Sequence, residues 1–117
     1  MNWTTLEHTD TLEEIKEISG SHPVVIFKHS TRCSVSSMAL NRLERNWKED
    51  EMANTNAFFL DLVRHRNVSN AVAEVFNVQH QSPQILIIKD GNCVYDNSHM
   101  GISYQDIKNT LKTLTAS

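Results

Sequence analysis

Two short apolar runs constrain the fold of this chain more than any other feature. Residues 24–27 (Val-Val-Ile-Phe) and 85–88 (Ile-Leu-Ile-Ile) are apolar throughout, a pattern typical of strands covered on both faces. Stretches with helical periodicity lie between the strand-like runs. The clearest is 68–76, where apolar residues recur at intervals of three and four. Strands that alternate with amphipathic helices predict an α/β fold.

The expected elements follow the order β-α-β-α-β-α-β-β-α. The strands are expected at residues 3–6, 24–28, 57–62, 84–89 and 93–97. The apolar sides of the helices are Leu12, Ile15 and Ile18; Val35, Met38, Ala39, Leu40, Leu43 and Trp47; Val68, Ala71, Val72, Val75 and Phe76; and Tyr104, Ile107, Leu111 and Leu114. Asp90-Gly91 is a two-residue hairpin signal. This order predicts a mixed central sheet with helices on both faces.

Composition narrows the possible classes of function. A chain of 117 residues fits a single domain, 1–117, and a net charge of -3 gives no basic field for nucleic acid or a membrane. The apolar runs are too short to span a bilayer, and the start of the chain lacks a secretory pattern, so we expect a cytoplasmic protein. Two cysteines are too few for a disulfide scaffold, and the six histidines show no zinc spacing, so no metal is expected.

Cys33 is the strongest candidate for chemistry. It lies where the strand-like run ends and a helical pattern begins, and a helix start stabilises a thiolate through its unpaired N–H groups and dipole. Lys28, His29 and Arg32 add positive charge nearby. Ser36 occupies the position of the second cysteine of a dithiol pair, so the motif is C-x-x-S. A structural role stays open, because most free cysteines are small buried apolar residues.

The element order, with a cysteine after the second strand and Pro83 before the fourth, resembles the thioredoxin fold. Residues 75–91 (Val-Phe-Asn-Val-Gln-His-Gln-Ser-Pro-Gln-Ile-Leu-Ile-Ile-Lys-Asp-Gly) are similar to the proline loop, strand and hairpin turn of that family. The resemblance implies that Pro83 is cis and faces Cys33, with Gln81, Ser82 and Pro83 forming the loop.

The segment around Cys33 is similar to the active site of the YtxJ-type monothiol bacilliredoxins, and the likeness covers essentially the whole chain. Members usually read Thr-x-Cys-Pro-Ile-Ser. This chain keeps Thr31, Cys33 and Ser36, with Ser34 in place of the proline and Val35 in place of the isoleucine. The residues expected to support the thiolate are Thr31, Arg32, Ser34, Ser36, Lys28 and His29.

The resemblance implies a thiol–disulfide oxidoreductase of redox homeostasis that removes bacillithiol, a cysteinyl-glucosamine-malate thiol, from protein mixed disulfides. Cys33 would attack the bacillithiol sulfur and become bacillithiolated, so bacillithiol is a covalent co-substrate and no cofactor is permanently bound. The implied partners are bacillithiolated client proteins, bacillithiol and a separate recycling reductase, with no nucleic acid and no membrane.

Bacillithiol carries carboxylates and hydroxyls, which call for cations and backbone donors. The carboxyl ends of parallel strands share one edge of a sheet, and the fifth strand returns to that edge. We therefore expect the ligand to contact Arg64, His65, Arg66, His99, Met100 and Gly101. The alternative for these residues is an ordinary solvated loop.

Two other classes of function stay open. The chain could be a non-enzymatic redox sensor modified at Cys33, or a thioredoxin-like interaction module. The hairpin turn predicts that Cys93 faces Ile88, five residues beyond Pro83. Since the resemblance implies that Pro83 faces Cys33, we expect Cys93 about 16 Å along the sheet from the Cys33 sulfur, at 3.3 Å per residue. Cys93 is therefore expected to be structural and not a resolving cysteine.

Overall fold

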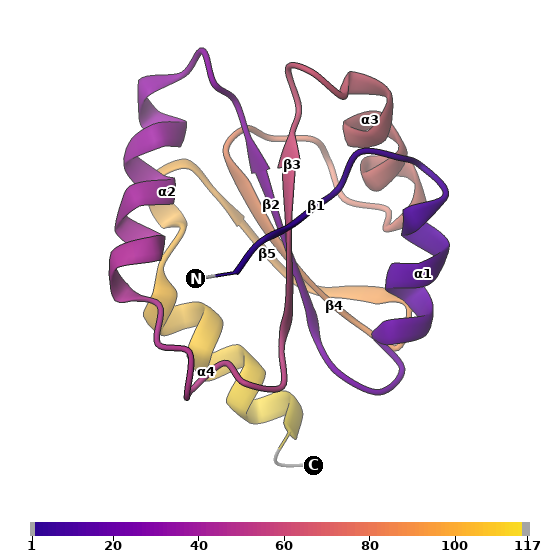
Figure 1. The fold of residues 1–117 in the computed structure, drawn as a ribbon, viewed down its shortest axis with the longest axis vertical. Coiled ribbons are helices and arrows are strands. Elements are labelled where there is room, and N and C mark those ends of the chain that lie inside the picture. Colours follow the sequence, from indigo (N-terminus) through magenta and orange to yellow (C-terminus); the bar gives the residue numbers. More distant parts are fainter. Residues whose placement is uncertain (1, 116–117) are drawn as a thin grey trace.

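The computed structural model describes residues 2–115 and contains one five-stranded sheet flanked by helices (Figure 1). The strands are β1 (Thr4–Thr5), β2 (Val24–His29), β3 (Asn56–Asp61), β4 (Gln84–Lys89) and β5 (Asn92–Ser98). The helices are α1 (Thr11–Ile18), α2 (Ser34–Asn46), α3 (Arg66–Val75), the short 3-10 helix η1 (His99–Gly101) and α4 (Tyr104–Thr115).

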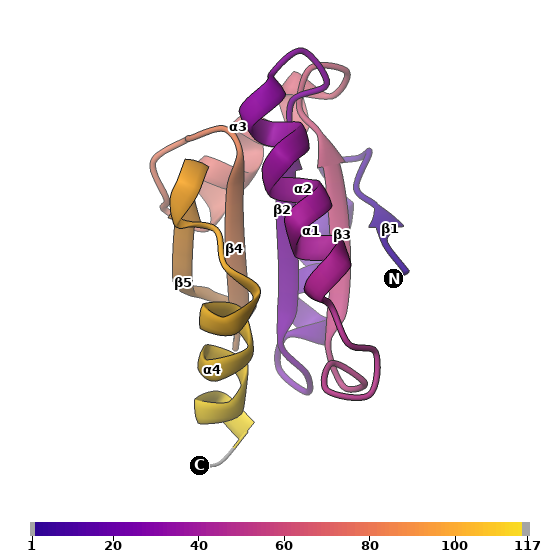
Figure 2. The same cartoon turned by 90° about the vertical axis from the view of Figure 1, so that its left-hand side faces the viewer.

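The strand order across the sheet is β1-β3-β2-β4-β5, as the turned view in Figure 2 shows. β1, β3 and β2 are mutually parallel, while β4 runs antiparallel to β2 and β5 antiparallel to β4. The predicted α/β class, the mixed sheet and the pairing of the terminal hairpin are confirmed.

Alternation along β2 divides the core into two layers. Val24 and Ile26 pack with residues of α1 and α3, whereas Val25 and Phe27 pack with residues of α2 and α4. Figure 1 shows these helix pairs on opposite sides of the strands. Both faces of β2 are therefore buried, which is why its sequence is apolar without alternation.

Some element boundaries and faces differ from the sequence prediction. The first strand is two residues long, and Trp3, which was expected in it, lies outside. The ring of Trp3 packs on Phe27, Trp47 and Phe59, each at a centroid distance of 6.0 Å. Met38 is 62 % exposed and does not belong to the buried side of α2. Methionine is adaptable, so its presence beside an apolar stripe does not settle the width of that stripe.

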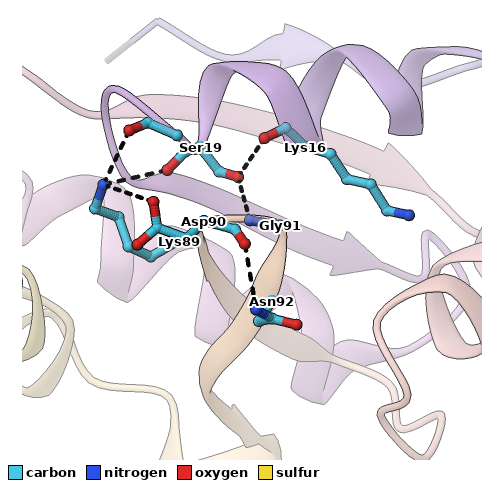
Figure 3. Close-up of polar contacts among 7 residues, drawn as sticks. Lys16, Ser19, Lys89, Asp90, Gly91 and Asn92 are labelled. Carbon is cyan, nitrogen blue, oxygen red and sulfur yellow. Dashed lines mark hydrogen bonds and ion pairs between the residues drawn. The ribbon is translucent and has the colours of Figure 1, made fainter.

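The β4–β5 turn is fixed to the end of α1 (Figure 3). Asp90 and Gly91 both have positive φ, as the predicted two-residue turn requires. The buried Ser19 hydroxyl accepts the Gly91 N–H at 2.8 Å and donates to the Lys16 carbonyl at 2.7 Å. The Asp90 N–H donates to the Ser19 carbonyl at 2.8 Å. This anchor sets the register of the hairpin from the end of the sheet remote from the β2–α2 junction.

Candidate active site

Cys33 is the N-cap residue of α2. Its backbone is extended (φ -118°, ψ 119°), its N–H donates to the Ser30 carbonyl at 3.2 Å, and its own carbonyl accepts the Ser37 N–H at 3.2 Å. The side chain is half-buried and makes no capping hydrogen bond. The predicted position of Cys33 at the strand–helix junction is confirmed, and its sulfur is a free thiol next to the helix's first turn.

Ser36 is fully buried beneath that turn. Its hydroxyl accepts the Ser30 N–H at 3.0 Å and lies 2.7 Å from Nδ1 of His29. Burial lowers the pKa of His29, more than the nearby Asp61 and Glu44 carboxylates raise it. The residue in the second position of the C-x-x-S motif therefore ties the loop before Cys33 to a neutral imidazole.

Three other residues around Cys33 are solvent-facing. Thr31, Arg32 and Ser34 are exposed, and within residues 2–115 their side chains make no hydrogen bond or ion pair. The Arg32 guanidinium is thus available to an incoming anionic group.

The proline loop, defined here as residues 79–83, lies next to the end of β2. The Ser82–Pro83 peptide bond is cis, as predicted. Gln84 pairs with Lys28 across the sheet, so Pro83 stands at the next position, opposite His29. Gln81 and Ser82 are half-buried, and the buried Ser82 hydroxyl has no hydrogen-bond partner among the described residues.

Lys28 does not direct its ammonium toward α2. Its Nζ donates to the Ser69 carbonyl of α3 at 3.2 Å and lies 3.2 Å from Nδ1 of His80, on the opposite face of the sheet. Burial lowers the pKa of Lys28 to about 8. Sequence reasoning missed Ser69 and His80, because only the docking of α3 brings them to β2.

We call the edge of the sheet that carries Cys33 and the proline loop the rim. The loop after β3 meets the start of α3 on this rim, and Figure 1 shows it beside the β2–α2 loop. His65 is the N-cap of α3, and its Nε2 lies 3.3 Å from a Glu7 carboxylate oxygen. Arg66 opens α3 and does not belong to the loop as predicted. Arg64 and Arg66 are exposed, and no carboxylate of residues 2–115 pairs with either guanidinium.

η1 reaches the same rim from β5. The His99 N–H donates to the Pro83 carbonyl at 3.1 Å, which joins η1 to the proline loop. His99, Met100 and Gly101 are all exposed. Arg42 of α2, which sequence reasoning missed, donates from Nη2 to the Ile102 carbonyl at 2.6 Å and holds η1 against α2. That contact spans 60 residues of sequence and leaves no local pattern.

Cys93 lies far from this rim. It pairs with Ile88, as the hairpin predicts, and its thiol donates to the Tyr95 carbonyl at 3.3 Å. Burial raises the pKa of the Cys93 thiol. Both cysteines are free.

Neither a metal cluster nor a membrane-spanning helix is found within residues 2–115. No group of three or more His, Cys, Asp or Glu side chains there is placed to hold a metal ion. None of the helices in that range combines the length and apolar character needed to cross a membrane.

Known structures share the fold of this chain. A protein described as an oxidoreductase with a thioredoxin fold is 25% identical, with a TM-score of 0.75, and the match covers 90% of this chain and 89% of that one. Thioredoxins of Malassezia sympodialis and Trypanosoma brucei brucei are each 12% identical with TM-scores of 0.74. The first match covers 96% of this chain and 90% of that one, and the second 99% and 93%. These two likenesses show the thioredoxin fold.

The family is shown by sequence. Residues 4–107 match the family model described as "Monothiol bacilliredoxin BrxC". That span includes Cys33, the proline loop and η1, so the match covers the whole rim described above. The chain belongs to the monothiol bacilliredoxins, and it is a thiol–disulfide oxidoreductase of thioredoxin fold.

Proposed function

We propose that this bacilliredoxin removes bacillithiol from mixed disulfides on client proteins, with Cys33 as the attacking thiolate. The observation that carries the proposal is the position of Cys33 at the start of α2, on the rim that also bears the proline loop and η1. The other cysteine pairs with Ile88, at the remote end of β4. The exchange is therefore assigned to one sulfur.

The reaction is a thiol–disulfide exchange that balances without an external cofactor. The Cys33 thiolate attacks the bacillithiol sulfur, a Cys33–bacillithiol disulfide forms, and the client sulfur leaves as a thiolate that takes a proton from solvent. A second thiol, either free bacillithiol or a separate reductase, attacks the new disulfide and releases the Cys33 thiolate. These steps need a reduced thiol pool, which fits a cytoplasmic location.

The cations of the rim suit the anionic part of bacillithiol. Arg64 and Arg66 stand at the start of α3 without a carboxylate partner among residues 2–115, and the helix N-terminus adds its own positive end. In this proposal the backbone of Gln81 and Ser82, next to the cis proline, pairs with the cysteinyl part of the ligand. His99 and Gly101 border the same edge.

Turnover of a bacillithiolated client tests the proposal. The parent protein and Cys93→Ala should release the client thiol, while Cys33→Ser should not. Intact mass after one turnover should show a single bacillithiol adduct that peptide mapping assigns to Cys33. An adduct without client release would instead identify a redox sensor. A Cys33→Ser variant that retains turnover would overturn the proposal.

A further inference from the structure

Lys28 is a buried lysine that no described carboxylate neutralises. Its side chain is 0 % exposed, and the partners of its Nζ within residues 2–115 are the Ser69 carbonyl and the His80 imidazole, each at 3.2 Å. An ammonium held in this way costs stability, because it has left water without gaining an opposite charge. An apolar side chain at this position would favour the fold more, so stability alone does not account for the lysine.

The contacts of Lys28 join the segments that form the rim. The residue lies on β2, five positions before Cys33, and pairs across the sheet with Gln84, which directly follows the cis proline. Its ammonium reaches α3 through Ser69 and the proline loop through His80. Gln84 holds the same loop from the same face of the sheet, since its Nε2 donates to the Gln79 carbonyl at 3.0 Å.

The contact between Lys28 and His80 has a fixed direction. An ammonium can only donate, so Nδ1 of His80 must be the unprotonated acceptor. Burial is the main cause that lowers the pKa of His80, and the positive charges of Lys28 on β2 and Arg66 on α3 lower it further. The Ser69 hydroxyl, 3.5 Å from Nδ1, is the remaining polar neighbour. The imidazole is therefore neutral at neutral pH, and acid removes its ability to accept.

We propose that Lys28 is a positioning residue for the exchange reaction. Its ammonium holds the proline loop at a set distance from Cys33. The S–S bond of a bound mixed disulfide then lies in line with the Cys33 sulfur that attacks it. This role rests on the proposed function of Cys33, and it gives the buried charge a purpose other than stability. Misplacing a bound reactant is enough to slow a reaction strongly even when the nucleophile is unchanged.

Amide hydrogen exchange tests the positioning independently of any activity. In Lys28→Met, the amide of His99, which donates to the Pro83 carbonyl of the loop at 3.1 Å, should exchange about tenfold faster, the factor that corresponds to one charge-assisted hydrogen bond. The midpoint of thermal unfolding at pH 7 should stay the same or rise. Lys16→Met, the same change at a partly exposed position of α1, is the control and should alter neither. Unchanged exchange at His99, or uniformly faster exchange across the protein with a lower midpoint, would overturn the proposal.

Kinetics then separate positioning from reactivity. For Lys28→Met, the alkylation rate of Cys33 by iodoacetamide should match that of the parent, while kcat/KM for a bacillithiolated client falls about tenfold. An equal loss in both rates would mean that Lys28 acts on the thiolate, and would sink the positioning role. If the parent itself does not release client, the proposed function fails, while the exchange of the His99 amide still decides whether Lys28 holds the loop.

Substitutions at His80 provide a second route, should Lys28→Met fold poorly. His80→Asn places an oxygen where Nδ1 stands and cannot be protonated, so it should keep kcat/KM near the parent value at pH 7. Below pH 6.5, kcat/KM divided by the alkylation rate should fall in the parent and stay level in His80→Asn. His80→Leu, which cannot accept, should show the loss at every pH. Identical pH profiles for parent and His80→Asn would refute the link.

Discussion

The Ser36 hydroxyl lies 2.7 Å from Nδ1 of His29 and accepts the Ser30 N–H at 3.0 Å. The second position of the C-x-x-S motif is thus filled by a group with structural bonds of its own. It fixes the loop that leads into Cys33 from below, while the Cys33 sulfur has no capping bond. This monothiol site therefore does more than lack a second sulfur, because a buried polar network occupies the position that the second cysteine of a dithiol pair would take.

Converting Ser36 to cysteine should restore a dithiol pair. Residues i and i+3 of a helix start lie on one face, so Ser36→Cys should form an internal disulfide with Cys33 under mild oxidant, as a mass two hydrogens lower would report. Ser34→Cys, at the exposed position next to Cys33, is the matched control and should form the disulfide more slowly, because neighbouring side chains of a helix do not face each other. Ser36→Cys should also lose about 1–3 kcal/mol of stability, because a thiol is a weak acceptor for the Ser30 N–H. Equal disulfide yields from the two variants would contradict the placement of Cys33 at the N-cap.

The buried ammonium of Lys28 predicts a pH dependence of stability. Its pKa is about 8 in the folded protein and near 10.5 when unfolded, so the unfolded state binds more protons between these values. The free energy of unfolding of the parent, relative to Lys28→Met, should rise through this window by up to about 3 kcal/mol. Below pH 8 the difference should be constant, with Lys28→Met at least as stable as the parent.

Urea unfolding followed by the fluorescence of Trp3 and Trp47 measures this difference. Burial and the Glu51 contact raise the pKa of Tyr104 to about 12, and this group titrates in both proteins, so it cancels in the comparison. The difference in free energy of unfolding between Lys16→Met and the parent should stay constant over the same pH range. A parent that gains nothing between pH 8 and 10 relative to Lys28→Met would show that the Lys28 ammonium is not buried in solution.

The hairpin anchor should affect stability without affecting turnover. Ser19→Ala removes the acceptor of the Gly91 N–H and should cost about 1–3 kcal/mol. Because the anchor lies at the end of β4 remote from Pro83, kcat/KM for a bacillithiolated client should stay within about twofold of the parent. Ser21→Ala, an exposed neighbour, serves as the control for stability. A selective loss of turnover in Ser19→Ala would indicate that the two ends of the sheet are coupled.

Much of the fold follows from local patterns in the sequence. The apolar runs 24–27 and 85–88 give the two central strands, and Asp90-Gly91 gives both the turn and the pairing of Cys93 with Ile88. The period of two along β2 also puts Lys28 in phase with Ile26, and so on the α3 side. These features depend on neighbours in sequence, which a single chain displays.

The site is less predictable because its contacts are long-range. The partners of Lys28 lie 41 and 52 residues away, and the bond from Arg42 that holds η1 spans 60 residues. Such contacts depend on how a helix docks on the sheet. Hydrophobic periodicity predicts which face of the helix is buried, but not which residues that face contacts. The width of that face is also ambiguous, as Met38 shows by lying outside it.

The last prediction concerns Cys93, the one cysteine outside the rim. Its pairing with Ile88 places it five residues beyond Pro83, or about 16 Å along the sheet, and disulfides need Cα atoms within about 7 Å. Its thiol donates to the Tyr95 carbonyl and packs against the core, and burial raises its pKa, so little thiolate forms. Cys93→Ala should keep full turnover with a bacillithiolated client and lose about 1 kcal/mol of stability.

A competing role for Cys93 makes a distinct prediction. If it resolved an oxidised Cys33, the hairpin would have to open, and several backbone hydrogen bonds between β4 and β5 would be lost for one disulfide. Non-reducing peptide maps of the oxidised parent should then contain a Cys33–Cys93 peptide, and Cys93→Ala should lose turnover. We expect neither, because the Ser19 anchor holds the turn closed from the other end. Finding both would refute the structural role of Cys93 together with the hairpin register that supports it.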